Sequence, residues 1–361
     1  MRLNKLAKKI FAAGLAVSLM MANAGVSFAA NYTPISGTAD KIKTSKEMTV
    51  TGSETVPATV TYKYAVTAKE TYAGAEGNPT IADITFTAGE TLTNGKATKD
   101  IVVDFSNVTY KEPGFYDYEV VETQEPAEVK GLTNNTETTK YIRVMVEDNE
   151  GTLVFSDKSF MYTIGEDGKE TKSEKFDCAF KTGTLTFNKT VTGNQGSHDQ
   201  YFKFTVTIPA NSGAKIKVAG TYDKAPAENA ATTYKAAEMA EANTIAEDTL
   251  VADETGTVTH DFYLQHGQSI VLSGIAAGVT YTVEEATAEG YTTKVKVDDG
   301  DETESQKAEG NVAETGSTAA FTNHKEGTIP TGVILDSAPF ILIIGLAAAA
   351  LIITAARKKV R

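Results

Sequence analysis

The stretch Gly183-Thr-Leu-Thr-Phe-Asn-Lys-Thr-Val-Thr-Gly193 has the alternation of a β-strand. Successive side chains of a strand point to opposite faces, so three apolar residues share one face here, Leu185, Phe187 and Val191. Lys189 falls on that same face. Burying an isolated ammonium is costly, so the simplest interpretation is a strand end at which Lys189 turns back to water.

The N-terminus has the features of a secretory signal peptide. Four basic side chains lie within the first nine residues, and an apolar run extends from Ile10 to about Met21. In Ser27-Phe-Ala29, small residues stand at the two positions that the cleaving peptidase recognises. This order of features predicts cleavage after Ala29, so residues 1–29 are assigned to the signal peptide.

The C-terminus, residues 327–361, combines a short motif with an apolar segment. Ile329, Pro330, Thr331 and Gly332 precede an apolar stretch from about Ala338 to Ala356 and a basic tail. That stretch is long enough to cross a bilayer, with the tail on the cytoplasmic side. The arrangement resembles the cell-wall sorting signal that sortases of Gram-positive bacteria recognise. The resemblance implies cleavage between Thr331 and Gly332 and transfer of the Thr331 carboxyl to an amine, so the chain contacts the membrane only before sorting.

Charge and cysteine content narrow the function classes. The full chain carries a formal net charge of −13, and removal of both terminal segments leaves about −20. Such an acidic surface argues against nucleic acid as a partner. Cys178 is the single cysteine, so an intramolecular disulfide is excluded, and any covalent cross-link must use other chemistry.

The mature chain reads as two β-rich units, residues 30–181 and 182–326. The first has alternating segments at 60–64, 101–105, 116–120 and 141–146, and the second has them at 201–208, 258–264, 269–272, 280–285 and 318–323. Short strands with regular turns predict an all-β fold of two tandem immunoglobulin-like sandwiches. The alanine-rich stretch 225–248 is either a short helix or an ordered loop, and the acidic run 297–314 is expected to be a solvated loop.

An internal duplication supports this organisation. Gly114 to Glu122 corresponds to Gly278 to Glu285, each a turn followed by a strand that ends in glutamate.

Three polar residues of the second unit alternate in phase with apolar neighbours. They are Lys189, Glu285 and Asn323, on the first, a middle and the last predicted strand. A buried lysine loses its proton more readily and becomes a nucleophile, while a buried carboxyl stays protonated and can polarise a carboxamide. We therefore expect Lys189 to attack the Asn323 side chain with Glu285 as proton shuttle, leaving an isopeptide bond.

These segments resemble a known family. Leu185 to Asn194, Tyr201 to Val206, Tyr281 to Glu285 and Phe321-Thr-Asn323 are similar to the streptococcal major shaft pilins of T-antigen type and their isopeptide-linkage domains, of the Cna B-type immunoglobulin-like fold. The resemblance implies a self-formed Lys–Asn bond assisted by Glu in each domain. In the second domain those roles fall on Lys189, Asn323 and Glu285.

The first domain departs from the family pattern. Lys46 and Glu122 match the lysine and glutamate positions, but Phe176-Asp-Cys-Ala-Phe180 stands where the family has Phe-Thr-Asn. We predict that this domain lacks the bond. Asp177 is the alternative carboxyl, although it alternates out of phase with its apolar neighbours.

The resemblance also implies a lysine near the end of the first domain that joins neighbouring subunits. The run Gly168 to Lys175 lies in that place, and Lys172 is the closest match. A solvated, charged strand edge is the competing interpretation of this run.

No cofactor or metal site is expected. The four histidines, His198, His260, His266 and His324, lack metal-ligand spacing, and Asp298 to Glu302 lacks a calcium-loop pattern. The leading hypothesis is a secreted structural pilin subunit at the cell wall, a sortase substrate rather than an enzyme, with neighbouring subunits or peptidoglycan as partners. The alternative is a monomeric wall-anchored adhesin of the same fold that binds a host-surface ligand.

Overall fold

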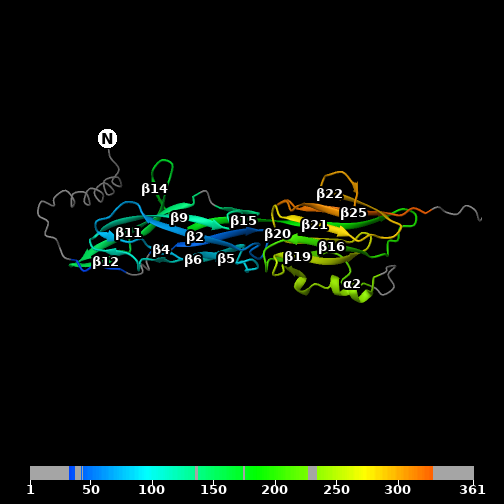
Figure 1. Ribbon diagram of the computed structural model, residues 1–361, viewed down its shortest axis with the longest axis horizontal. Coiled ribbons are helices and arrows are strands. Elements are labelled where there is room, and N and C mark those ends of the chain that lie inside the picture. The colour runs from blue at the N-terminus through cyan, green and yellow to red at the C-terminus, as the bar shows by residue number, and fades with distance from the viewer. Residues whose placement is uncertain are drawn as a thin grey trace, which may run out of the picture.

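The computed structural model describes residues 32–36, 42, 44–134, 137–173, 175–226 and 234–327. Within them the chain forms two β-sandwiches arranged end to end as a rod (Figure 1). The predicted all-β class with two tandem sandwiches is confirmed. The segments predicted as signal peptide and sorting signal, including Ile329 to Gly332, lie outside the described residues. No helix in the described part of the chain is long and apolar enough to span a membrane.

The first sandwich consists of two facing sheets and two small ribbons. One sheet has the order β6 (Lys96–Ile101), β1 (Thr44–Thr51), the first part of β15 (Lys175–Thr192) and β10 (Leu132–Asn134). The other has the order β14 (Glu170–Lys172), β13 (Phe160–Ile164), β11 (Thr139–Asn149), β9 (Gly114–Glu125), β2 (Val60–Ala68) and β5 (Ile84–Phe86), with β12 (Thr152–Phe155) on β11. The ribbons pair β3 (Ala75–Glu76) with β8 (Thr109–Tyr110), and β4 (Thr80–Ile81) with β7 (Val103–Asp104).

The second sandwich also has two sheets. The larger has the order β18 (Thr249–Val251), β17 (Lys215–Thr221), β20 (Ser269–Ala276), the second part of β15, β25 (Ser317–His324), β22 (Thr292–Val297) and β23 (Thr303–Glu304). The smaller has the order β19 (Thr257–Leu264), β16 (Phe202–Pro209), β21 (Thr280–Glu285) and β24 (Lys307–Asn311).

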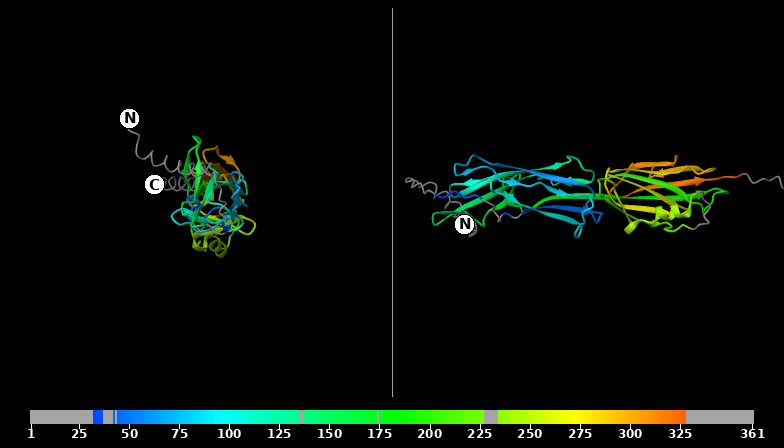
Figure 2. Two further views of the ribbon diagram at one scale, coloured as in Figure 1. Left: turned by 90° about the vertical axis from the view of Figure 1, so that its left-hand side faces the viewer. Right: turned by 60° about the horizontal axis from the view of Figure 1, so that its bottom comes forward.

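A single strand, β15, belongs to both sandwiches. Its first part runs parallel to β1, and its second part runs parallel to β25 and antiparallel to β20. The boundary predicted between residues 181 and 182 therefore falls inside a continuous strand, which Figure 2 shows crossing between the two bodies. Gly183 is required there because a Cβ would lie 2.0 Å from the Ala313 carbonyl oxygen.

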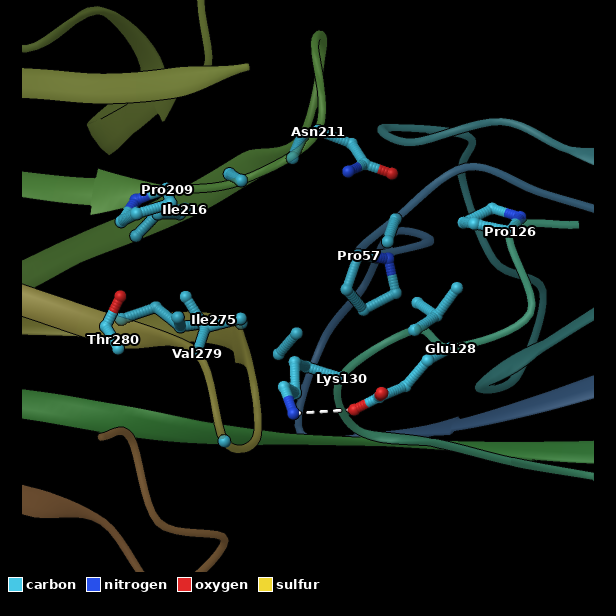
Figure 3. A pocket seen from close by; sticks show the side chains of 17 residues that line it. Pro57, Pro126, Glu128, Lys130, Pro209, Asn211, Ile216, Ile275, Val279 and Thr280 are labelled. Carbon is cyan, nitrogen blue, oxygen red and sulfur yellow. Dashed lines mark hydrogen bonds and ion pairs between the residues drawn. The ribbon is translucent and has the colours of Figure 1, made fainter.

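Hydrogen bonds hold the two sandwiches together beside β15. The Asn211 side-chain oxygen accepts a hydrogen bond from the Thr59 amide at 2.6 Å, and the Ala277 amide donates to the Lys181 carbonyl at 3.0 Å. A pocket of about 320 Å³ lies at this junction, between residues that include Pro57 of the first sandwich and Ile275 of the second (Figure 3). Its walls are mostly apolar.

Each sandwich has its own apolar core. In the second, alternate residues of β15 and β16 are fully buried, among them Leu185, Phe187, Phe204 and Val206. In the first, buried tyrosines are prominent, and Tyr62, Tyr110 and Tyr118 are inaccessible to solvent. The alternation that predicted the strands is thus the alternation of buried and solvent-facing side chains.

Three segments differ from, or sharpen, the sequence expectations. The alanine-rich stretch contains helix α2 (Ala236–Asn243) and the short 3-10 helix η1 (Ala246–Asp248). The expectation of a solvated loop over 297–314 was wrong in part, because β24 pairs with β21 there. The single strand expected over 101–105 is divided between β6 and β7, and Val102 between them is exposed.

Helix α2 covers the edge of the smaller sheet. Asn243, in its last turn, is fully buried. Its side-chain oxygen accepts a hydrogen bond from the Tyr263 amide, and its side-chain nitrogen donates one to the Tyr263 carbonyl, both at 2.9 Å, as the backbone of a paired strand would. These bonds satisfy polar groups of β19 that an uncovered edge would leave open.

Candidate functional site

Lys189 lies in the core of the second sandwich rather than at a strand end. Its side chain is buried, and Nζ donates hydrogen bonds to both carboxylate oxygens of Glu285 at 2.8 Å. The ammonium also lies 4.3 Å from the centroid of the Phe202 ring. A carboxylate and an aromatic face thus replace water around this cation.

Asn323 completes the cluster from the last strand. The parallel register of β15 and β25 places Val191 opposite Asn323, so Lys189 and Asn323 lie two positions apart on the same face of the sheet. Asn323 Nδ2 donates to Glu285 Oε1 at 2.5 Å, the oxygen that Lys189 also contacts. Asn323 Oδ1 is buried and has no hydrogen-bond partner among the described residues.

Burial shifts the pKa values of the two charged groups toward each other. It lowers the pKa of Lys189 to about 8, against the attraction of Glu285. It also raises the pKa of Glu285, against the opposing effects of Lys189 and Asn323. Both shifts favour the uncharged forms. A neutral amine, a carboxylic acid and a carboxamide can therefore meet in one dry site, which is the set of groups that acyl transfer to an amine requires.

The first sandwich contains a similar pair. Lys46, from β1, is fully buried and donates to Glu122 Oε1 at 2.7 Å, and its Nζ lies 3.7 Å from the centroid of the Tyr62 ring. Glu122 Oε2 is buried without a hydrogen-bond partner in the described chain. The structure thus brings together the lysine and the glutamate that the sequence pointed to in this domain.

Asp177 does not join this pair. Its side chain is 42% exposed and its Oδ1 lies 3.3 Å from Lys175 Nζ, on the other face of β15. The buried residue is Cys178, which the register places opposite Met48, two residues after Lys46. Sequence reasoning placed Phe176-Asp-Cys-Ala-Phe180 where the family has Phe-Thr-Asn but considered only Asp177. Position by position, Phe176-Asp-Cys178 matches Phe321-Thr-Asn323, so Cys178 is the residue that stands at the asparagine position.

Lys140 is a second buried lysine that the sequence analysis did not single out. Its Nζ donates to Ser173 Oγ at 2.7 Å and lies 5.2 Å from the centroid of the Phe176 ring. Burial lowers its pKa, while the nearby carboxylates oppose that shift. The signal was available, because Lys140 alternates in phase with Ile142 and Val144.

Lys172, the candidate for joining subunits, is exposed. It ends the short edge strand β14, opposite Tyr162 of β13, and Figure 1 shows the β14 hairpin standing out from the first sandwich. Its amine is accessible from solvent, unlike those of Lys46 and Lys189. The segment predicted as the sortase signal, to which it would be joined, lies beyond residue 327, outside the described residues.

Comparisons with known proteins match both sandwiches. Residues 42–181 match the family model described as Spy0128-like isopeptide containing domain, and residues 183–325 match a domain of unknown function, DUF7601. A pilin of Streptococcus pyogenes serotype M1 is 28% identical over 281 residues, which are 75% of this chain and 74% of that protein. The pilus tip adhesin Cpa of Streptococcus pyogenes is 27% identical over 155 residues, 43% of this chain and 18% of the adhesin.

Solved structures agree with the sequence comparisons. The crystal structure of the major pilin from Streptococcus pyogenes has a TM-score of 0.55 and 23% identity, and the match covers 81% of this chain and 100% of that chain. This likeness establishes the fold. By sequence, the first sandwich matches the Spy0128-like isopeptide containing domain, and the chain as a whole is similar to streptococcal major pilins.

Proposed function

We propose that this chain is a structural pilin subunit of a Gram-positive bacterium, secreted, processed by sortase and held at the cell wall. Its second sandwich is closed by a self-formed isopeptide bond between Lys189 and Asn323. The observation that supports this proposal is the meeting of Lys189, Glu285 and Asn323 from three strands in a core that excludes water.

The reaction begins with a proton transfer. Lys189 passes a proton to Glu285, which makes both groups neutral, a change that their burial favours. A half-turn of the Asn323 amide then lets its unpartnered Oδ1 accept a hydrogen bond from the protonated carboxyl. This hydrogen bond polarises the carbonyl and aims a donor at the oxygen that will carry the developing negative charge.

Bond formation follows as an acyl transfer. The lone pair of Lys189 Nζ attacks Asn323 Cγ, and the Cγ–Nδ2 bond breaks. Glu285 takes a proton from Nζ and delivers it to Nδ2, so that ammonia leaves and the carboxyl is regenerated. The product amide is neutral, so Lys189 no longer carries a charge. Glu285 is then the one ionisable group that remains of this pair, and it is protonated. The protein acts on itself once and turns over no external substrate.

Intact-mass spectrometry of the secreted chain tests the bond. We expect a mass about 17 Da below the sequence value, the mass of one ammonia, and a tryptic peptide in which Lys189 is joined to Asn323. Lys189→Met should have its full sequence mass, since it lacks the nucleophile. A native chain of unshifted mass would refute the proposed bond.

Polymerisation through Lys172 is the second part of the proposal. The exposed amine at the β14 edge is free to attack the Thr331 acyl group that sortase holds on a neighbouring subunit, forming an intermolecular isopeptide bond. Peptidoglycan would provide the amine for the last subunit. The tip adhesin to which this chain is also similar suggests further pilus partners.

A monomeric wall-anchored adhesin that binds a host-surface ligand is the second candidate function. The similarity of 155 residues to a pilus tip adhesin favours it. The two functions differ in one observable product, a covalent ladder of subunits in cell-wall extracts, which only the pilin forms.

A further inference from the structure

The two sandwiches close in the same way. In the first, β1 runs parallel to the start of β15; in the second, the end of β15 runs parallel to β25. Each first strand carries a buried lysine opposite a phenylalanine of the last strand, Lys46 with Phe176 and Lys189 with Phe321. The last strand of one sandwich continues as the first strand of the next, so one geometry occurs twice along the rod.

The surroundings of the two lysines also correspond. Each ammonium lies over an aromatic ring, Tyr62 in the first sandwich and Phe202 in the second. Two residues later on the same strands, Tyr64 is paired with Glu122, and Phe204 is paired with Glu285.

A second aromatic contact repeats in both sites. Tyr64 meets the Phe176 ring edge to face at 5.3 Å, and Phe204 meets the Phe321 ring in the same manner at 5.1 Å. The lysine, the glutamate and the three rings of each site thus correspond position by position in the strand registers.

Position 178 is where the two sites differ in the electrophile, while Tyr62 and Tyr64 add hydroxyl groups where the second site has Phe202 and Phe204. Cys178 lies opposite Met48, two residues past Lys46, as Asn323 lies opposite Val191, two residues past Lys189. A thiol has no carbonyl carbon for an amine to attack. Lys46 and Glu122 consequently remain an ion pair in this chain, although the site holds both the amine and the carboxyl that the reaction requires.

The first site retains an unfilled polar position. Glu122 Oε2 is buried and has no hydrogen-bond partner among the described residues, although Oε1 of the same carboxylate is bonded to Lys46. In the second sandwich the corresponding carboxylate contacts Asn323 as well as Lys189. The buried Tyr64 hydroxyl near this carboxylate also has no hydrogen-bond partner among the described residues. A carboxamide at position 178 would supply a further partner for Glu122, and it is similar in size to the cysteine that it replaces.

We propose that the first sandwich holds a latent cross-linking site in which Cys178 occupies the electrophile position, so that Cys178→Asn alone creates an isopeptide bond between Lys46 and the new side chain at position 178. This inference rests on the chemistry proposed for the second sandwich. In the variant, Lys46 Nζ attacks Cγ of the new carboxamide, the Cγ–Nδ2 bond breaks, and Glu122 carries the proton from Nζ to the departing ammonia. No oxidant or further reactant is needed.

The experiment compares intact masses of the native chain and Cys178→Asn, each followed by tryptic mapping. The native chain reports the second sandwich by one loss of about 17 Da, and the variant should lose about 17 Da more. The additional loss should map to a peptide joining residues 46 and 178. Because the two bonds appear in different peptides, failure of one is distinguished from failure of the other.

Matched variants isolate the position and the mechanism. Asp177→Asn places the same carboxamide one residue away on the exposed face and should give no additional loss. Cys178→Ser removes the thiol without adding a carbonyl and should also give none. Adding Glu122→Ala to Cys178→Asn should abolish the additional loss.

The proposal is overturned if Cys178→Asn unfolds cooperatively like the native protein and yet shows no second loss. Should that variant fail to fold, Cys178→Asp provides the same test, because condensation of Lys46 with a carboxyl removes one water, about 18 Da. Labelling of the denatured native chain with an acetylating reagent gives an independent readout. Lys46 should be acetylated and Lys189 should not, and a protected Lys46 would refute the assignment of its site as unreacted.

Discussion

Lys189 and Asn323 lie on the first and last strands of the second sandwich and contact the same oxygen atom, Glu285 Oε1. The two residues are 134 positions apart in the chain, so this contact joins the ends of the domain. A bond between them would close a loop that contains nearly the whole domain. Its loss should therefore be measurable in the mass and in the stability of the chain.

Glu285→Ala should prevent bond formation. Without the carboxyl, no group moves the proton from Lys189 Nζ to the leaving nitrogen, and the lysine is left buried without its counter-ion. We expect the full sequence mass and a lower melting temperature. Glu284→Ala is the matched control, because Glu284 is the next residue along the strand and its side chain is exposed. This variant should still show the loss of one ammonia. Bond formation in Glu285→Ala would remove this residue from the mechanism.

Asn323→Ala should retain the fold with reduced stability. Loss of the cross-link restores the chain entropy of the unfolded state, which for a loop of this length amounts to about 5 kcal/mol on the model used for disulfides. We expect a fall in melting temperature of roughly 15 °C by calorimetry. Asn188→Ala, next to Lys189 but on the other face of β15, should melt close to the native protein.

Asn323→Asp provides a chemical check on the same bond. Condensation of the new carboxyl with Lys189 releases water rather than ammonia, so the linked product has the same mass as the native chain. If the variant folds but has its full sequence mass, with no loss of water, the carboxamide leaving group is required.

The stability of the unlinked Asn323→Ala variant should rise with pH above neutrality. Lys189 has a pKa of about 8 in the folded chain against an ordinary value of 10.5, so between these values the unfolded state binds one more proton. The free energy of unfolding should therefore increase over this window, by up to roughly 3 kcal/mol, since each pKa unit is about 1.4 kcal/mol.

Chemical denaturation at pH 7.5 and 9.5 measures this dependence. The comparison is with Asn323→Ala combined with Lys189→Met, in which the increase should be absent. The useful range ends near pH 10. Burial raises the pKa of Tyr281 to about 12 in the folded chain, whereas its ordinary value is 10. Above pH 10 this side chain therefore loses its proton in the unfolded state but keeps it in the folded state, which lowers the free energy of unfolding.

Lys172→Ala should abolish the ladder of covalent multimers in cell-wall extracts while leaving the internal mass loss unchanged. Lys169→Ala is the control, because Lys169 is exposed in the same hairpin and pairs with Asp167. A ladder that persists in Lys172→Ala but disappears when another lysine is replaced would reassign the linking amine. The absence of a ladder in the native strain would favour the adhesin.

The buried polar cluster of the second sandwich could be predicted because each member breaks a simple pattern. Lys189, Glu285 and Asn323 fall where strand alternation calls for an apolar residue, and the structure buries all three. Phase within a strand is a local property, so it needs no knowledge of the fold. Which strands are neighbours is not local, and the contacts among the three side chains could be described only once the register of β15 and β25 was known.

Other features depend on contacts that alternation does not encode. Gly183 suggests a turn between domains, yet the strand continues through it, and the glycine is there because the Ala313 carbonyl approaches closely. Strand β24 was missed because its sequence is polar and Ala308 is its one fully buried side chain. Cys178 drew no attention as a site residue because a thiol is an ordinary core side chain.

The continuity of β15 determines which residues would bear tension in a fibre. With neighbours joined at Lys172 and Thr331, a pull enters the subunit three residues before β15 and passes along that strand to Lys189. It would cross to Asn323 through the proposed isopeptide bond and leave toward the C-terminus. The other strands of the first sandwich precede Lys172 in the chain, so they would lie outside this path. Under the proposed linkage its Lys46–Glu122 ion pair would lie off this path, so tension along the fibre would place no demand for a covalent bond there.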